Sequence, residues 1–200
     1  MDCPALSDLY AAPSDLALAK QLDHVDTHAA RFIAASPFLV LASADREGRC
    51  DASPRGDAPG FVQVAHERLL RLPDRPGNNR IDSLRNIEAN PQVGLLFFVP
   101  GVIETLRVNG QARWVADPVL LDQMAVYGKR PRSILEISVT EVFFHCGKAL
   151  KRGALWESSG AGGARADIPS LGRILADQTG RIGVEEAEAR VTEAYARHLY

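Results

Sequence analysis

Short apolar segments separated by turn residues fill the middle of this chain, between residues 36 and 146. Most of them are joined by hairpin-type turns, of which residues 45–48 (DREG) are one example. Strands joined by short turns pair antiparallel, because parallel neighbours need a long crossover connection. The pattern therefore predicts about seven strands with two short inserted helices, a mainly β fold of the α+β class built on an antiparallel barrel.

The strand predictions follow the apolar runs and alternation along the chain. They cover residues 38–44, 50–54, 61–65, 69–72, 93–99, 102–108, 112–115 and 134–145. Asn109-Gly110 is a strong signal for a two-residue hairpin, so the strands on either side of it are expected to pair. The inserted helices are expected at residues 81–89, ended by an Asn-Pro pair, and at residues 117–127, opened by an aspartate cap and a proline.

The chain is expected to have three parts: an N-terminal helical segment (residues 1–35), the barrel domain (36–157), and a linker with C-terminal helices (158–200). One amphipathic helix is predicted over residues 14–35, with Ser14 as its cap. The Ser/Gly-rich stretch at residues 158–163 is predicted to be a flexible break. Helices at residues 171–178 and 184–199 follow it, and we expect them to pack on the barrel or on a second subunit.

Composition excludes several classes of function. The 200 residues carry a net charge of −2, which provides no basic field for a nucleic-acid partner. The three cysteines are widely spaced, so neither a disulfide framework nor a zinc ribbon is expected. No apolar run approaches the ~20 residues that span a bilayer, and the first residues lack a secretory pattern. We expect no membrane contact and a cytoplasmic location.

The sequence offers little for a metal site or for hydrolytic chemistry. His24 and His28 lie four residues apart, but a third ligand is not evident, so a polar helix face is the better interpretation and no metal is expected. Cys146 is predicted to be a small buried residue rather than a redox thiol. No catalytic-triad motif, Walker loop or dinucleotide-binding glycine motif occurs.

The segment from residue 72 to residue 101 combines a strand end, a Pro/Gly/Asn turn, a short helix and a buried strand. Its turn and helix start are crowded with hydrogen-bond donors: Asn78, Asn79, Arg80, Ser83 and Arg85. Backbone amides at a helix start, with an arginine beside them, suit a phosphate group. The alternative is an ordinary turn with a helix cap, in which asparagine and serine satisfy backbone groups.

The order of these segments resembles that of the FMN-binding split-barrel family that includes pyridoxamine 5′-phosphate oxidase. The similarity rests on SPRG at residues 53–56, the Phe61-Val62 pair, residues 78–86, NPQVGLLF at 90–97 and LRVNGQA at 106–112. A subgroup of uncharacterised flavoproteins in that superfamily is most similar, through SPRGD, LPDRPGNNR, ETLRVNG and FHCGKAL. The resemblance covers about residues 30–156, and it implies an antiparallel split β-barrel.

The resemblance also implies a homodimer with FMN bound at the subunit interface. The FMN phosphate would lie near the turn before the short helix, with Asn78, Asn79, Arg80 and Ser83 as candidate ligands and Arg85 in reserve. The vitamin enzyme has a basic Ser-Arg-Lys run there, whereas this chain has Ile81-Asp82-Ser83. The C-terminal Trp-x-x-Pro-x-Arg substrate segment of that enzyme is not visible, so oxidation of pyridoxamine phosphate is not carried over.

Further cofactor candidates come from the same resemblance. Arg55 could place a cation near the flavin ring, or it could be a surface arginine paired with Asp57. Phe61 and Val62 could line the ring or belong to the barrel core.

Thr105 lies on a strand that contacts flavin in family members, and alternation puts Arg107 on the same side of that strand. The alternative is a solvated face. Lys148, Arg152 and Trp156, spaced by four, could share a helix face that closes over the ring or binds an anionic substrate. Their alternative is a solvated cationic face with one anchoring tryptophan.

These features predict an FMN-dependent oxidoreductase that acts on a small-molecule substrate. No residue is assigned to proton transfer. Three rival interpretations stay open: a non-catalytic flavin-binding or flavin-sequestering protein, a deazaflavin- or haem-using relative with His145 as the possible haem ligand, and a cofactor-free interaction protein.

Overall fold

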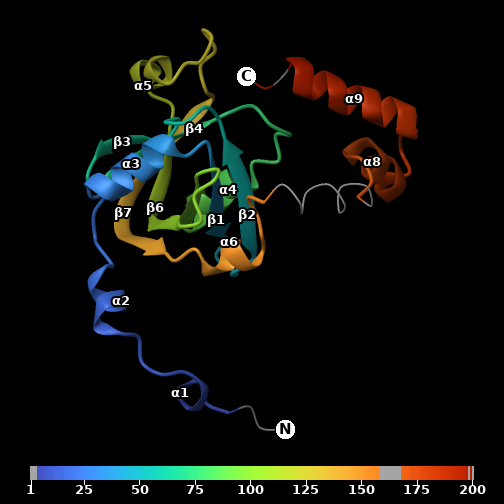
Figure 1. The fold of residues 1–200 in the computed structure, drawn as a ribbon. Coiled ribbons are helices and arrows are strands. Elements are labelled where there is room, and N and C mark those ends of the chain that lie inside the picture. The colour runs from blue at the N-terminus through green and yellow to red at the C-terminus, as the bar shows by residue number, and fades with distance from the viewer. Residues whose placement is uncertain (1–3, 158–167, 198, 200) are drawn as a thin grey trace.

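The computed structural model describes residues 4–157, 168–197 and 199. Its centre is one seven-stranded sheet with the order β2-β1-β5-β6-β7-β4-β3, in which all neighbouring strands are antiparallel (Figure 1). The strands are β1 (Phe38–Ala44), β2 (Cys50–Gly56), β3 (Gln63–His66), β4 (Leu69–Asp74), β5 (Gln92–Phe98), β6 (Thr105–Val115) and β7 (Ser133–His145). The predicted mainly β fold, an antiparallel split barrel with flanking helices, is confirmed.

The sheet curls so that one face becomes the core. In β1, Leu39 and Leu41 are fully buried while their neighbours are partly or fully exposed, as expected for side chains that alternate across a strand. Leu95, Phe97 and Leu106 continue the buried layer on β5 and β6. Helices α3 (Thr27–Ala35) and α4 (Asp82–Ala89) add Ala29, Ile33 and Ile87 to the same core. α3 packs on β3 and β6, and α4 packs on β1, β2 and β6.

The prediction of one helix over residues 14–35 is wrong. The structure has α2 (Asp15–Ala19), capped by Ser14 as predicted, and α3, capped by Asp26, with a short α1 (Leu6–Leu9) before them. Between α2 and α3, Leu22 exchanges two backbone hydrogen bonds with Val142 of β7, at 3.0 and 2.8 Å. This pairing satisfies backbone groups in an extended conformation, so tertiary contacts override the helical spacing of the apolar residues.

The predicted hairpin at Asn109-Gly110 is also wrong. Residues 105–115 form the single long strand β6, and its pairing with β7 shifts register at Asn109/Gly110, which is the mark of a β-bulge. A Cβ atom on Gly110 would lie 2.3 Å from the backbone oxygen of Ser138. Glycine is needed here for close approach of two strands, not for a turn.

Other boundaries shift by a few residues. β2 extends to Gly56, β3 begins at Gln63, and α5 (Pro118–Gln123) ends four residues before the predicted limit at 127, with Asp117 as its cap as expected. α6 (Lys148–Arg152) follows β7.

The C-terminal helices α8 (Leu171–Thr179) and α9 (Val184–Arg197) pack on each other. Gly172 meets the backbone of Glu188, and Ala176 and Ala187 are buried between them. Figure 1 shows this pair beside the barrel rather than on it, and the barrel core contains none of its residues. Packing on a second subunit stays a prediction, and the predicted flexible break at 158–163 lies outside the described residues.

Candidate functional site

One ion pair joins β2 to β4, strands that are not neighbours in the sheet, and a second joins the residues that directly follow these strands. Arg55 on β2 donates to Asp74 on β4 at 2.7 Å, and Arg75 donates to Asp57 at 2.7 Å. All four side chains are at least four-fifths buried, with exposed fractions between 2% and 17%. We call this line of contacts the seam, because it joins the two sides of the split barrel.

Ser83 connects the seam to the start of α4. Arg55 donates to Ser83 Oγ at 3.2 Å, and Ser83 donates to Asp51 at 2.6 Å. The Nε of Arg55 is buried without a hydrogen-bond partner among the described residues. The structure thus brings together two predicted site residues, Arg55 and Ser83, and pairs Arg55 with Asp74 rather than with Asp57.

The loop before α4 has an unusual backbone. Asn79 and Ile81 have φ angles of 60° and 52°, in the left-handed region that a β-branched side chain rarely adopts. The Asn78 side chain accepts a hydrogen bond from the Arg80 amide at 3.0 Å, which is the predicted turn chemistry. Such local strain is held by surrounding contacts and is typical of functional loops.

Two arginines border this loop. Arg80 pairs with Asp82 at 2.7 Å, and this carboxylate raises the pKa of the Arg80 guanidinium. Arg132, which precedes β7, donates to the Asn79 side chain at 2.9 Å. Arg80 is three-quarters exposed, so its remaining donors are open to a ligand. The side chains of this loop and the arginine beside it form one exposed, donor-rich group. We call it the 78–80 loop; it comprises Asn78, Asn79, Arg80 and the neighbouring Arg132.

The seam and the 78–80 loop differ in charge. The Arg55 guanidinium lies among the carboxylates of Asp74 and, through Ser83, Asp51, so an incoming dianion would meet negative charge there. In the loop, Arg80 and Arg132 outnumber Asp82. An anionic ligand is therefore better accommodated by the loop than by the buried side of Arg55.

A second group of polar side chains lies on the outer face of β6 and β7. Arg107 forms a hydrogen-bonded ion pair with Glu141, and Asn109 donates to the same carboxylate oxygen at 3.0 Å. The ring of Phe143 has Lys20 Nζ 4.3 Å and Arg107 Cζ 5.1 Å from its centroid. Arg107 lies on the same side of β6 as Thr105, as the alternation predicts, and it is partly exposed whereas Thr105 is buried.

His145 ends this row. Its ring centroid is 5.1 Å from that of Phe143 in an edge-on arrangement. Partial burial lowers the pKa of His145 from its ordinary value of 6.5, and the nearby Arg107 and Lys20 lower it further, against an opposing effect of Glu141. Thr105, a predicted site residue, is the partner of His145 across the two strands and is buried.

The remaining predicted residues lie elsewhere. Val62 belongs to the core and Phe61 packs against it. Lys148 and Arg152 share the exposed α6 helix, but the expectation that Trp156 continues the same helix face is wrong, since α6 ends at Arg152. Trp156 instead donates to the Val102 carbonyl at 2.8 Å. No described contact links these residues to the 78–80 loop, and their role toward a cofactor stays a prediction.

Two further expectations concern cysteines and metals. Cys146 is exposed, so its prediction as a buried residue is wrong; it follows the last residue of β7 rather than lying within the strand. Across residues 4–157, 168–197 and 199, no group of three or more potential ligands is placed to hold a metal ion. In the same ranges no helix has the length and apolar character needed to cross a membrane.

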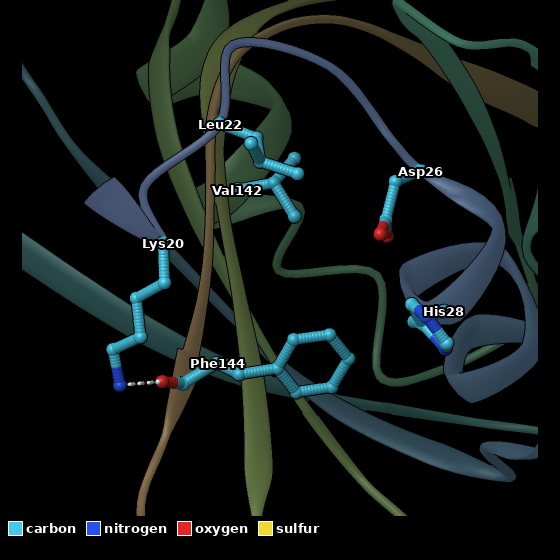
Figure 2. A pocket seen from close by; sticks show the side chains of 6 residues that line it. All are labelled: Lys20, Leu22, Asp26, His28, Val142 and Phe144. Carbon is cyan, nitrogen blue, oxygen red and sulfur yellow. Dashed lines mark hydrogen bonds between the residues drawn. The ribbon is translucent and has the colours of Figure 1, made fainter. Parts of the chain in front are cut away.

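A hollow of about 450 Å³ lies between the N-terminal segment, α3 and β7. Figure 2 shows the side chains around it. It is lined by Lys20, Leu22, Asp26, His28, Val142 and Phe144. Asp26 caps α3 through the Ala29 amide at 2.8 Å, and Lys20 donates one hydrogen bond to the Phe144 carbonyl at 2.8 Å. Half of the lining residues are apolar, so the hollow offers less to a polar ligand than the two groups described above.

Sequence reasoning missed several residues of these groups. Asp51, Asp74 and Arg132 are distant from their partners along the chain, and only the curled sheet brings them together. The role of Lys20 was missed because the sequence predicted one continuous helix over residues 14–35, with no strand-like pairing to β7. The alternation of β7, which exposes residues 141, 143 and 145 on one face, is the signal that could have found Phe143.

Comparison with protein families decides the affiliation of the chain. The family model described as pyridoxamine 5′-phosphate oxidase matches residues 25–146, more than half of the sequence. The chain belongs to the pyridoxamine 5′-phosphate oxidase family. The match spans every strand of the barrel together with α3 and α4, and it ends before α6.

Solved structures of HupZ share the fold at low sequence identity. HupZ from Group A Streptococcus superposes with a TM-score of 0.50 at 14% identity, over 60% of this chain and 93% of HupZ. A protein from Lactobacillus delbrueckii, described as a putative pyridoxamine 5′-phosphate oxidase, has a TM-score of 0.49 at 19% identity, over 62% of this chain and 98% of its own. A comparison with curated proteins finds no significant match. Family membership thus rests on the family model, and the superposition on HupZ shows the fold alone.

Proposed function

We propose that this member of the family is an FMN-binding flavoprotein that acts as an oxidoreductase on a small molecule. The observation that carries the proposal is the exposed, donor-rich 78–80 loop at the start of α4, in a chain whose barrel matches the family over residues 25–146. Fold alone is a weak guide to substrate, so the substrate is left open.

The loop fits a phosphate group by its donor set. Arg80 and Arg132 supply guanidinium groups, Asn78 and Asn79 supply side-chain amides, and the first amides of α4 point out of the helix start. Ser83 fits less well, because its hydroxyl is buried and already shared between Arg55 and Asp51. In the proposed site, Arg80 and the two asparagines hold the phosphate. Arg132 is a further donor, and Ser83 supports the loop without contacting the phosphate.

When bound, FMN would supply two-electron redox chemistry. The chain's own part would be to hold the phosphate and to limit solvent access. A cation near the ring would favour negative charge on it. The seam pairs Arg55 closely with Asp74, so this arginine has little charge left for that role.

The absorption spectrum of the purified protein, with the released cofactor identified by mass, tests the cofactor. Oxidised-flavin bands and the mass of FMN are expected. A Soret band would favour haem, and a deazaflavin mass would favour a different two-electron carrier. A colourless protein whose melting temperature is unchanged by added FMN would contradict the proposal and favour a cofactor-free interaction protein.

A second test separates catalysis from sequestration. The flavoprotein should be reduced rapidly by a small-molecule electron donor from a screened panel that includes nicotinamide cofactors, and the reduced form should be reoxidised by an acceptor such as oxygen. Tight FMN binding without reduction by any member of that panel would favour the flavin-sequestering alternative.

We further propose that the protein is a homodimer formed through the outer face of β1 and β5. Phe38 is 40% exposed there and lies beside Phe98, with ring centroids 6.0 Å apart. Val40 and Leu96, which pair across the two strands, are partly exposed on the same face. Contiguous exposed apolar surface of this kind is typical of subunit contacts.

Sedimentation tests the dimer. A mass near twice 21.7 kDa is expected, and Val40→Glu should reduce it to the monomer value. A monomer that still binds FMN would contradict an interface site.

We also propose a cytoplasmic location, because Cys50 and Cys146 are exposed free thiols, which a reducing compartment preserves.

A further inference from the structure

Positive charge gathers around one aromatic ring at the outer end of β6 and β7. Lys20 Nζ lies 4.3 Å and Arg107 Cζ 5.1 Å from the centroid of Phe143. Cations are attracted to an aromatic face, which explains why two like charges lie near the same ring. We call Lys20, Arg107, Phe143 and His145 the cationic cluster.

Lys20 is fixed in this position by the backbone. The pairing of Leu22 with Val142 ties the N-terminal segment to the edge of β7, and Lys20 Nζ then donates to the Phe144 carbonyl at 2.8 Å (Figure 2). An ammonium group has three donors, so this bond leaves two of them available. The side chain is thus anchored and still able to bind a second acceptor.

The cluster carries more positive than negative charge. Glu141 offsets one cation through its hydrogen-bonded ion pair with Arg107, and it also accepts from Asn109. Arg107 Nε is buried without a partner among the described residues, although the side chain as a whole is 35% exposed. With His145 neutral, Lys20 and Arg107 against Glu141 leave one net positive charge.

His145 supplies a third polar group. Its ring meets the edge of Phe143, and the lowered pKa keeps the imidazole largely neutral at pH 7. A neutral imidazole still has one N–H donor. The charged groups that face it are Arg107 from β6, Lys20 from the N-terminal segment and Glu141 from β7 itself.

We propose that the cationic cluster binds the carboxylate group of a small-molecule ligand, with Lys20, Arg107 and His145 as donors. One net positive charge matches a monoanion, whereas a phosphate dianion would leave a negative excess beside Glu141. The planar guanidinium of Arg107 also matches a carboxylate in shape. The site shares no residue with the 78–80 loop, so it goes beyond the proposed cofactor and does not depend on it.

Benzoate and its neutral analogue benzamide test the proposal on the full-length protein as purified. The readout is the imidazole signal of His145 in NMR spectra of histidine-labelled protein, assigned with His145→Gln. Benzoate should shift this signal saturably and raise the pKa of His145, because a bound anion favours the charged imidazole. Benzamide at equal concentration should do neither.

Two variants locate the effect. Lys20→Gln and Arg107→Gln should each weaken benzoate binding about tenfold, the loss expected for one charge-assisted hydrogen bond. Arg190→Gln removes the same charge from the exposed α9 helix and should leave benzoate binding unchanged. Lys20→Gln changes an exposed residue, so the test remains valid even if Arg107→Gln lowers stability.

Several outcomes would overturn the inference. They are an equal response to benzamide, a uniform response of all five histidines, and benzoate binding that neither variant at the cluster weakens. Tighter binding of inorganic phosphate than of benzoate, at matched ionic strength, would overturn the carboxylate assignment. None of these readouts involves bound FMN, so their failure is distinguishable from failure of the proposed cofactor.

Discussion

Arg55 and Arg107 have similar bonding but lie on opposite faces of the same curled sheet. Each has a buried Nε without a described partner, and each forms an ion pair with a carboxylate on another strand. Their surroundings differ. Arg55 is 17% exposed among Asp74, Ser83 and, beyond the serine, Asp51, whereas Arg107 is 35% exposed and shares Phe143 with a second cation.

The difference separates a structural arginine from one able to bind a ligand. In the seam, carboxylates match or exceed the positive charge, so Arg55 holds two strands together and has little left for an anion. On the outer face, Lys20 makes the charge net positive and solvent reaches the site. Burial and local charge balance, more than residue type, decide which of the two a ligand can use.

Breaking the seam should have the largest effect on stability. Arg55→Gln leaves the carboxylate of Asp74 buried without its charged partner, so we expect a loss of about 3 kcal/mol in the free energy of unfolding. Denaturant unfolding measures it. The double variant with Asp74→Asn should recover part of the loss, and Arg190→Gln in an exposed helix pair should cost less than about 0.5 kcal/mol. A loss that small for Arg55→Gln would contradict the structural role.

The 78–80 loop should have the next largest effect, on cofactor rather than on stability. Arg80→Ala should weaken FMN binding by roughly 1.5–3 kcal/mol if its guanidinium contacts the phosphate. Calorimetry with FMN and with riboflavin, which lacks the phosphate, separates this contact from ring binding. The variant should lower affinity for FMN alone, and an unchanged FMN affinity would remove Arg80 from the site.

Arg107→Gln sharpens the comparison with Arg55→Gln. Because Arg107 is more exposed, its loss should cost only about 1 kcal/mol of unfolding free energy, after allowing for solvent screening. The same change should raise the pKa of His145, because it removes a nearby cation. NMR titration of His145 reads this effect directly. Equal destabilisation by the two variants would erase the distinction between the faces.

The smallest expected effect is a pH dependence from His145. Its pKa is lower in the folded protein than its ordinary value of 6.5, so the unfolded chain binds the proton more readily. This contribution leaves stability unchanged well above pH 6.5 and reduces it as pH falls through 6.5 toward the folded pKa. Unfolding of the protein and of His145→Gln at pH 7.5 and 5.5 measures it. The variant should lose less stability between those values than the natural chain.

Much of the barrel was predictable from sequence. Alternating apolar residues, the turn at residues 45–48 and the Asn-Pro stop after α4 are local signals, because strand periodicity and backbone chemistry act over a few residues. The order of these signals along the chain also carried the family resemblance, which the match over residues 25–146 confirms. The sequence alone therefore determined the fold class and the position of the donor-rich turn.

Tertiary structure decided the rest. It divided the predicted helix over residues 14–35 by pairing Leu22 with Val142, and it turned Asn109-Gly110 into a bulge against Ser138. It also set the charge balance of Arg55 and Arg107, since their partners come from strands far along the chain. Such pairings depend on how the sheet curls and on which groups lose contact with water, and no local stretch of sequence contains that information.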